Sequence, residues 1–138
     1  AGLALLNHGT VGFGHLRLSI IDLVSGQQPL HNDDGSVSLV FNGEIYDYKN
    51  LRTQLQAEGY VFRTTSDSEV LLRLYERHGL DFFKFLNGEF ALLIWDQKRR
   101  RLVAGRDRMG VKPLFYHVSG SEILFASEAK AILALPRV

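Results

Sequence analysis

The residues best suited to chemistry are Asn42 and Gly43, which follow the apolar run Leu39-Val40-Phe41. An apolar run bounded by turn residues is typical of a buried strand. The Asn42 side-chain amide and the Gly43 backbone N–H are hydrogen-bond donors, and two fixed donors at a strand end can polarise a carbonyl oxygen. Asn-Gly is also the commonest short turn signal, so these residues alone favour a strand-ending turn.

Two charged residues stand in unusual surroundings. Arg17 lies within the apolar residues 16–21, where a guanidinium is costly unless it is paired, bound to a ligand or turned toward water. The residues leave these interpretations of Arg17 open. Asp67 lies in the first turn of an expected helix, where it would offset the positive helix end or hold a cation. The residues around Asp67 favour the first of these roles.

Several familiar catalytic and metal-binding patterns are absent from the sequence. It contains no Cys, which excludes a thiolate nucleophile or thiolate metal ligand within these residues. No HExxH, GxxxxGK[ST], GxGxxG or GxSxG pattern occurs, so no metal site, phosphate cradle or nucleophile elbow is predicted. Among the scattered His residues, only His15 has tightly apolar neighbours, and a structural role is predicted for it.

The elements that would position Asn42 and Asp67 are strands and amphipathic helices. Asp34-Gly35 predicts a turn into a strand at 37–41. Ser66 to Glu69 matches a capping box in which Glu69 reaches back to the N-terminus of the helix. The other expected elements are strands within 1–21, at 60–64, 90–95, 101–105, 114–118 and 123–126, and helices at 47–58 and 127–133. Strands, then helices, then hairpin-linked strands predict an α+β domain built on antiparallel sheets.

Length and charge narrow the function classes. The chain has 138 residues and a net charge of +1, which suits one domain and gives no general case for binding nucleic acid or an anionic membrane. The basic cluster Lys98-Arg99-Arg100-Arg101 is therefore interpreted as a solvated turn. No apolar run is long enough to span a membrane. The absence of Cys favours a reducing compartment, and a cytoplasmic location is expected.

Seven segments in register resemble the glutaminase domain of class II glutamine amidotransferases. They are residues 14–22, 26–30, 42–46, 65–69, 88–91, 106–116 and 127–131. Each segment alone is a weak signal, but their order and spacing cover almost the whole chain. Asn-Gly-Glu-Ile-Tyr at 42–46 is more similar to the asparagine synthetase type than to the phosphoribosyl- or hexosamine-linked relatives.

The resemblance implies an N-terminal-nucleophile hydrolase fold, a four-layer αββα sandwich of antiparallel sheets. Residues 1–138 would form a single, incomplete domain of this kind. The implied reaction is hydrolysis of the glutamine side-chain amide to glutamate and ammonia, which would serve ATP-dependent amide synthesis in an asparagine synthetase-like enzyme. In this family an N-terminal Cys thiolate attacks the amide, and its own α-amine serves as general base.

Position by position, the resemblance assigns Asn42 and Gly43 to the oxyanion hole. Arg17 would pair with the substrate α-carboxylate, because a planar guanidinium matches a carboxylate. Asp67 would take the α-ammonium group, and Glu44 would help to frame the site. The residues whose backbone would line the same substrate pocket are Leu18, Ser19, Ile20 and Ile21.

The sequence departs from the family pattern because the Cys nucleophile has no counterpart. The strand and helix expected before residue 1 and the synthetase domain are also missing from these 138 residues. The expected partners are therefore L-glutamine, that N-terminal strand and the synthetase domain, and ATP and magnesium would belong to the latter. No cofactor is expected in the chain itself. Uncovered sheet edges predict self-association.

Three hypotheses follow from these residues. The first is a piece of a glutamine-hydrolysing enzyme that is inactive as it stands. The second is a glutamine-binding module without chemistry. The third is a partner-binding remnant whose partner supplies the missing strand.

Overall fold

Three antiparallel sheets and three α-helices make up the part of the chain that the computed structural model describes, which is residues 2–16, 27–136 and 138. The strands are β1 (Gly2–Leu6), β2 (Val11–His15), β3 (Leu30–His31), β4 (Val37–Ile45), β5 (Gly88–Asp96), β6 (Arg101–Arg106), β7 (Phe115–Ser119) and β8 (Glu122–Ala126). The helices are α1 (Tyr48–Ala57), α2 (Asp67–His78) and α3 (Ala129–Leu133), with 3-10 helices η1 (Asn7–Gly9) and η2 (Gly79–Phe85). Within the described residues, no helix is long and apolar enough to cross a membrane.

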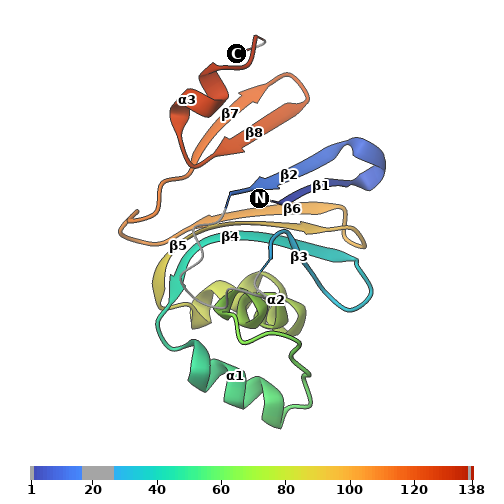
Figure 1. Cartoon of the computed structure of the whole chain (residues 1–138), viewed down its shortest axis with the longest axis vertical. Coiled ribbons are helices and arrows are strands. Elements are labelled where there is room, and N and C mark those ends of the chain that lie inside the picture. The colour runs from blue at the N-terminus through green and yellow to red at the C-terminus, as the bar shows by residue number, and fades with distance from the viewer. Residues whose placement is uncertain (1, 17–26, 137) are drawn as a thin grey trace.

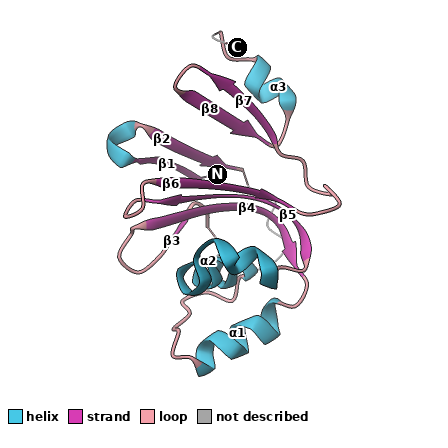
Figure 2. Cartoon of the chain, turned by 180° about the vertical axis from the view of Figure 1, so that it is seen from behind, coloured by secondary structure: helices cyan, strands magenta, loops and turns pink. Residues whose placement is uncertain are grey.

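The four-stranded sheet, in the order β3-β4-β5-β6, is the middle layer of the molecule. Helices α1 and α2 lie on one of its faces, and the hairpins β1–β2 and β7–β8 lie on the other (Figures 1 and 2). The main core fills the space between sheet and helices, where Leu39, Ile45, Val70 and Leu71 are fully buried. A smaller apolar cluster joins β2 to the sheet. The predicted α+β class with antiparallel sheets is confirmed.

Strand β4 does not end at Asn42 and Gly43, so the favoured strand-ending turn was wrong. The strand continues to Ile45 and pairs with β5 along its whole length. Gly43 has a φ of 147°, and a Cβ atom there would lie 2.0 Å from the Glu89 carbonyl oxygen of β5. Glycine is therefore needed for a close approach of two strands, not for a reversal of the chain.

No strand forms over residues 60–64, and here too the prediction was wrong. The backbone N–H groups of Arg63 and Thr64 donate to the Glu69 carboxylate at 2.9 and 2.7 Å. A side chain thus occupies the donors that a strand ladder would use. The same contacts correct the capping box: Ser66 caps α2 by accepting from the Ser68 N–H, but the Glu69 carboxylate reaches past Ser66 to the N–H groups of Arg63 and Thr64.

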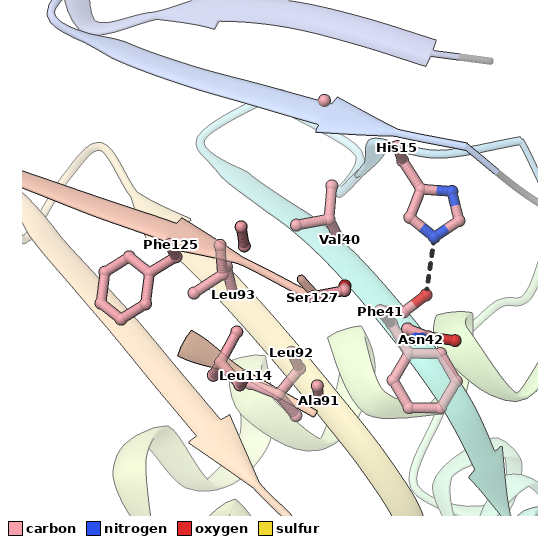
Figure 3. Close-up of a pocket in the computed structure, with 12 residues that line it drawn as sticks. His15, Val40, Phe41, Asn42, Ala91, Leu92, Leu93, Leu114, Phe125 and Ser127 are labelled. Atoms are coloured by element: carbon pink, nitrogen blue, oxygen red, sulfur yellow. Dashed lines mark hydrogen bonds between the residues drawn. The ribbon is translucent and has the colours of Figure 1, made fainter. Parts of the chain in front are cut away.

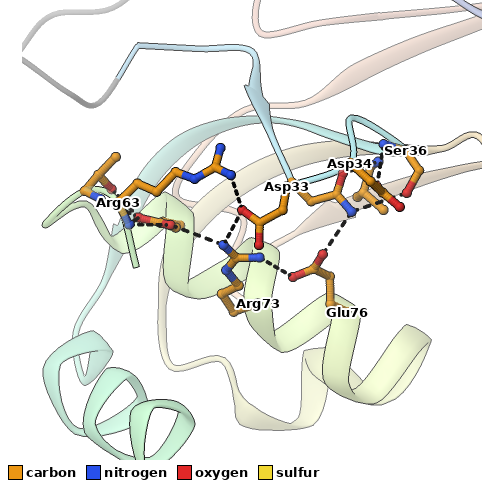
Figure 4. Close-up of polar contacts among 10 residues, drawn as sticks. Asp33, Asp34, Ser36, Arg63, Arg73 and Glu76 are labelled. Atoms are coloured by element: carbon orange, nitrogen blue, oxygen red, sulfur yellow. Dashed lines mark hydrogen bonds and ion pairs between the residues drawn. The ribbon is translucent and has the colours of Figure 1, made fainter. Parts of the chain in front are cut away.

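An ion-pair network ties the turn between β3 and β4 to α2 (Figure 4). The Arg73 side chain is only 5% exposed, and its guanidinium contacts Asp33 at 3.1 Å and Glu76 at 2.9 Å. Asn32 donates to the other oxygen of Glu76 at 2.9 Å. The hydrogen bond from Arg73 holds the pKa of Asp33 below its usual value. The network fixes the β3–β4 hairpin against the helix that carries Asp67.

A buried hydrogen bond joins α2 to the β5–β6 turn and gives a stability prediction. The Tyr75 hydroxyl donates to Asp96 at 2.9 Å, and burial together with this bond raises the pKa of Tyr75 to about 12. Tyr75→Phe removes a donor from a buried carboxylate, so we expect the free energy of unfolding to fall by about 1.5 to 3 kcal/mol. Urea unfolding at pH 7 measures this change. Tyr116→Phe, at a side chain that is 69% exposed, should change nothing.

Candidate functional site

On the edge of β4 that faces away from β5, the backbone first pairs with strand β3 and then hydrogen-bonds to a side chain. Strand β3 pairs with β4 only at Ser38 and Leu39. Two residues further on, the Gln28 side-chain amide takes the place of a strand. Its Oε1 accepts from the Phe41 N–H at 2.6 Å, and its Nε2 donates to the Phe41 carbonyl oxygen at 2.9 Å. At Phe41, immediately before Asn42, the Gln28 side chain therefore makes the hydrogen bonds that a neighbouring strand would make.

Asp67 holds the same edge on the other side of Gly43. It is the first residue of α2 and is 7% exposed. Its Oδ2 accepts a hydrogen bond from the Ile45 N–H at 3.1 Å. Alternate residues of an antiparallel strand direct their backbone groups to the same side, so Gly43 faces this edge between Phe41 and Ile45, where no strand of the described residues pairs with it. The structure therefore brings Asp67 to the segment 42–44.

The carboxyl group of Asp67 has a perturbed pKa. Burial raises this pKa most, and the nearby Glu44 raises it further, whereas backbone hydrogen bonds from Ile45 and Ser68 lower it; the net direction is upward. A buried carboxylate beside a second carboxylate is stabilised in its charged form by an adjacent cation. The arrangement is therefore suited to a ligand that presents an ammonium group.

A cavity of about 100 Å³ lies between the sheet and the two hairpins (Figure 3). Residues from four strands line it, among them His15 of β2, Asn42 of β4, Leu92 of β5 and Phe125 of β8. The His15 Nε2 atom donates to the Phe41 carbonyl oxygen at 3.0 Å, which fits the structural role predicted for this histidine. Asn42, by contrast, is exposed and is one of the residues that line the cavity.

A larger groove, of about 810 Å³, lies between η2 and residues 106–111, and none of the predicted site residues that the structure describes lines it. Asp107 organises its far wall. Burial raises the pKa of Asp107, but hydrogen bonds from the backbone of Val111, Lys112 and Phe90 outweigh that effect and lower the pKa to about 2. The sequence showed only a charged loop here; an Asp three residues before Gly110 is the local signal for such a turn.

Four of the predicted site residues are described, and they lie around one end of β4. Asn42, Gly43 and Glu44 are consecutive in the strand, and Asp67 contacts the residue that follows them. The remaining predicted residues, Arg17, Leu18, Ser19, Ile20 and Ile21, lie outside the described residues.

Gln28 is the residue at this site that the sequence did not single out. It belongs to one of the resembling segments, but no role was attached to it. No local pattern in the sequence indicates its role, because the register is known only from the structure: Leu30 pairs with Leu39, so two steps further along an antiparallel ladder residue 28 meets residue 41. In the structure the side chain of Gln28, rather than its backbone, bonds the backbone of Phe41.

Known proteins resemble the chain along almost its whole length. A sequence profile for the glutamine amidotransferase domain matches residues 2–138. The amidase chyE of Penicillium rubens is 49% identical over 126 residues, and asparagine synthetase (glutamine-hydrolysing) 2 of Bacillus subtilis is 48% identical over 126 residues. Both matches cover 91% of this chain. The chain spans only 19% and 17%, respectively, of the length of these two relatives.

Solved structures share the fold. The glutamine phosphoribosylpyrophosphate amidotransferase from B. subtilis, complexed with ADP and GMP, superposes with a TM-score of 0.66 and 31% sequence identity. The match covers 76% of this chain and 25% of that chain. This likeness confirms the expected N-terminal-nucleophile hydrolase type of layered antiparallel sheets.

Proposed function

Since this chain belongs to the glutamine amidotransferase domains of the asparagine synthetase family, we propose that residues 42–44 and Asp67 form part of an L-glutamine site. The observation that carries this proposal is the position of Gly43 on the open edge of β4. Its two neighbours on that edge, Phe41 and Ile45, are both held by side chains. The site would support release of ammonia from the glutamine side-chain amide.

The chemistry required is stabilisation of a tetrahedral oxyanion. When a thiolate adds to the amide carbon, negative charge develops on the carbonyl oxygen. The C–N bond then breaks as the α-amine that took the thiol proton returns it to the nitrogen, so ammonia leaves and a thioester remains; water cleaves the C–S bond and releases glutamate and the thiol. The Asn42 side-chain amide and the Gly43 N–H are the donors that would hold that oxygen. Removal of one such donor typically costs about 2.7 to 4 kcal/mol of transition-state stabilisation.

To recognise the α-ammonium and α-carboxylate groups of glutamine, the site needs one residue of opposite charge for each of them. Asp67 would accept the α-ammonium group, with Glu44 adding to the negative potential next to it. Arg17 would bind the α-carboxylate, and the backbone at 18–21 would line that pocket. This division of roles is supported by the raised pKa of Asp67, which burial and Glu44 produce and which a bound ammonium group would reverse.

The wider context of the site is also part of the proposal. These 138 residues contain no Cys, so the thiolate would come from polypeptide outside them. The ammonia would pass to a synthetase domain that uses ATP and magnesium. Exposed apolar side chains on β1, such as Leu3 at 80% and Leu5 at 73% exposure, favour contact of this hairpin with further polypeptide, and they also favour self-association of the isolated chain.

The 138-residue chain alone should release no ammonia from glutamine above the buffer background, because it lacks the nucleophile. A coupled ammonia assay on the purified chain tests this directly. The matched comparison is a chimera that adds the segment preceding the matched region in the B. subtilis asparagine synthetase 2 relative, including the N-terminal Cys expected for the family. We expect turnover by the chimera and not by its Cys→Ser variant. Turnover by the 138 residues alone would contradict the proposed mechanism.

A further inference from the structure

We propose that Gln28 is a positioning residue, which holds the donor pair Asn42 and Gly43 in place by bonding both backbone groups of Phe41. The inference rests on the proposed function, because it assigns Gln28 a part in forming the oxyanion site. It concerns a side chain that acts through Phe41, the residue before the two donors.

The geometry is that of a sheet ladder finished by a side chain. At its first step the Asn32 N–H donates to the Val37 carbonyl oxygen at 3.0 Å, and at its second step Leu30 pairs with Leu39. At the third step the Gln28 amide supplies both an acceptor and a donor to Phe41. The ladder therefore reaches the residue before Asn42 without a third backbone pairing.

Gln28 is itself held firmly enough to act in this way. A Cβ atom at Gly2 would lie 1.7 Å from the Gln28 carbonyl oxygen, so β1 packs directly against the main chain of Gln28. From the other side, His15 donates to the same Phe41 carbonyl oxygen at 3.0 Å. The peptide group that joins Phe41 to Asn42 is thus fixed by two side chains from different segments.

The backbone before Asn42 needs to be held because the residue after Asn42 is Gly43, and glycine has the most conformational freedom of any residue. Gly43 has no side chain to restrain it and adopts a φ of 147°, a conformation that glycine reaches easily and also leaves easily. Fixing the peptide before Asn42 restricts the orientation of both donors. An oxyanion site depends on donors that do not reorient during the reaction.

The test compares Gln28→Met with Gln27→Met, since Gln27 is an exposed neighbour and methionine preserves the length of the side chain. Two quantities are measured: amide hydrogen exchange by NMR, and the dissociation constant for L-glutamine by calorimetry. In Gln28→Met we expect exchange at Phe41, whose N–H loses its acceptor, to accelerate about tenfold and glutamine binding to weaken about tenfold. Exchange at Leu74 in the core of α2, and all values in Gln27→Met, should stay as in the wild type.

A second variant, Gln28→Glu, supplies a readout that a merely structural role would not give. A protonated glutamic acid can accept and donate as the amide does, whereas its carboxylate would face the Phe41 carbonyl oxygen without a proton to share. Exchange at the Phe41 N–H should be faster in Gln28→Glu than in the wild type. This difference should grow as the pH rises through the pKa of the introduced carboxyl group, which is about 4.3 for an unperturbed Glu. The excess in Gln28→Met should not depend on pH.

The outcomes separate this inference from the function on which it rests. If wild-type protein binds glutamine and Gln28→Met binds it equally well, the positioning role is wrong and the glutamine site stands. If wild type binds no glutamine but both Gln28 variants show the local exchange changes, the glutamine site is wrong and Gln28 still orders residues 41–43. Exchange that accelerates equally at Leu74 would overturn the positioning role, because it would report only a loss of overall stability.

Discussion

Gly43→Ala should disrupt the pairing of β4 with β5 and destabilise the whole protein. The added Cβ would lie 2.0 Å from the Glu89 carbonyl oxygen and 2.7 Å from the Phe90 Cα atom, so two backbones would have to separate. The φ of 147° is also unfavourable for alanine. Strain and overpacking together predict a loss of about 4 kcal/mol in the free energy of unfolding. Urea unfolding followed by circular dichroism measures this loss.

The matched control for that experiment is Gly35→Ala in the β3–β4 turn. Gly35 also has a positive φ, of 72°, but a Cβ there would meet nothing within 4 Å. Gly35→Ala should lower the free energy of unfolding only by the cost of placing alanine in a left-handed backbone conformation, about 1 to 2 kcal/mol. Equal losses at the two positions would mean that β4 and β5 do not approach as closely at Gly43 as the structure shows.

Asp67→Asn should weaken the binding of L-glutamine without lowering the free energy of unfolding. Asparagine keeps an oxygen that can accept from the Ile45 N–H, so the link between α2 and β4 survives. It loses the charge that would pair with the α-ammonium group of glutamine. A hydrogen bond to a charged group is worth about 1.5 to 3 kcal/mol, which corresponds to a roughly tenfold to hundredfold weaker affinity. Calorimetric titration of both proteins with L-glutamine measures the difference.

The stability of the unliganded Asp67→Asn protein should equal or exceed that of wild type at pH 7. Burial raises the pKa of Asp67 above its ordinary value of 3.8, so ionisation of this group opposes folding. The stabilisation by the neutral form is complete below pH 3.8 and is lost as the pH rises through the folded-state pKa. The advantage of the variant should therefore appear at pH 7 and vanish near pH 4. An advantage that grows on acidification would contradict the direction of this pKa shift.

The elements that the sequence predicted well are those set by local patterns. The capping residue Ser66 predicted the start of α2, and the helix does begin at Asp67. A strand was predicted at 90–95, and β5 (Gly88–Asp96) forms there, between β4 and β6. These signals act over a few residues, so they can be recognised without knowledge of the tertiary structure.

The features that the sequence did not predict depend on side chains that bond distant backbone. Glu69 takes the donors that a strand at 60–64 would need, and Gln28 and Asp67 hold Phe41 and Ile45 across 13 and 22 residues. Hydrogen-bond partners at such separations leave no periodic pattern in the sequence.

At the candidate site, the residue types indicated which chemistry was possible, but they did not predict how the residues are arranged. Asn42 and Gly43 were recognised as possible oxyanion donors, although local turn statistics favoured a chain reversal there. Only the pairing of Gly43 with Phe90 across two strands showed why glycine is required. Asp67 was predicted at a helix start, which is correct. Its contact with the strand that carries Asn42 is tertiary, and no local signal indicates it.

The most direct test of a glutamine site at the open edge of β4 is an NMR titration of the 138-residue chain with L-glutamine. The proposed function predicts saturable shifts of the Gly43 N–H and the Asn42 side-chain amide. It also predicts clearly weaker binding of L-asparagine, whose amide falls one methylene short. The absence of saturable shifts at these two residues, or equal responses to glutamine and asparagine, would contradict the account.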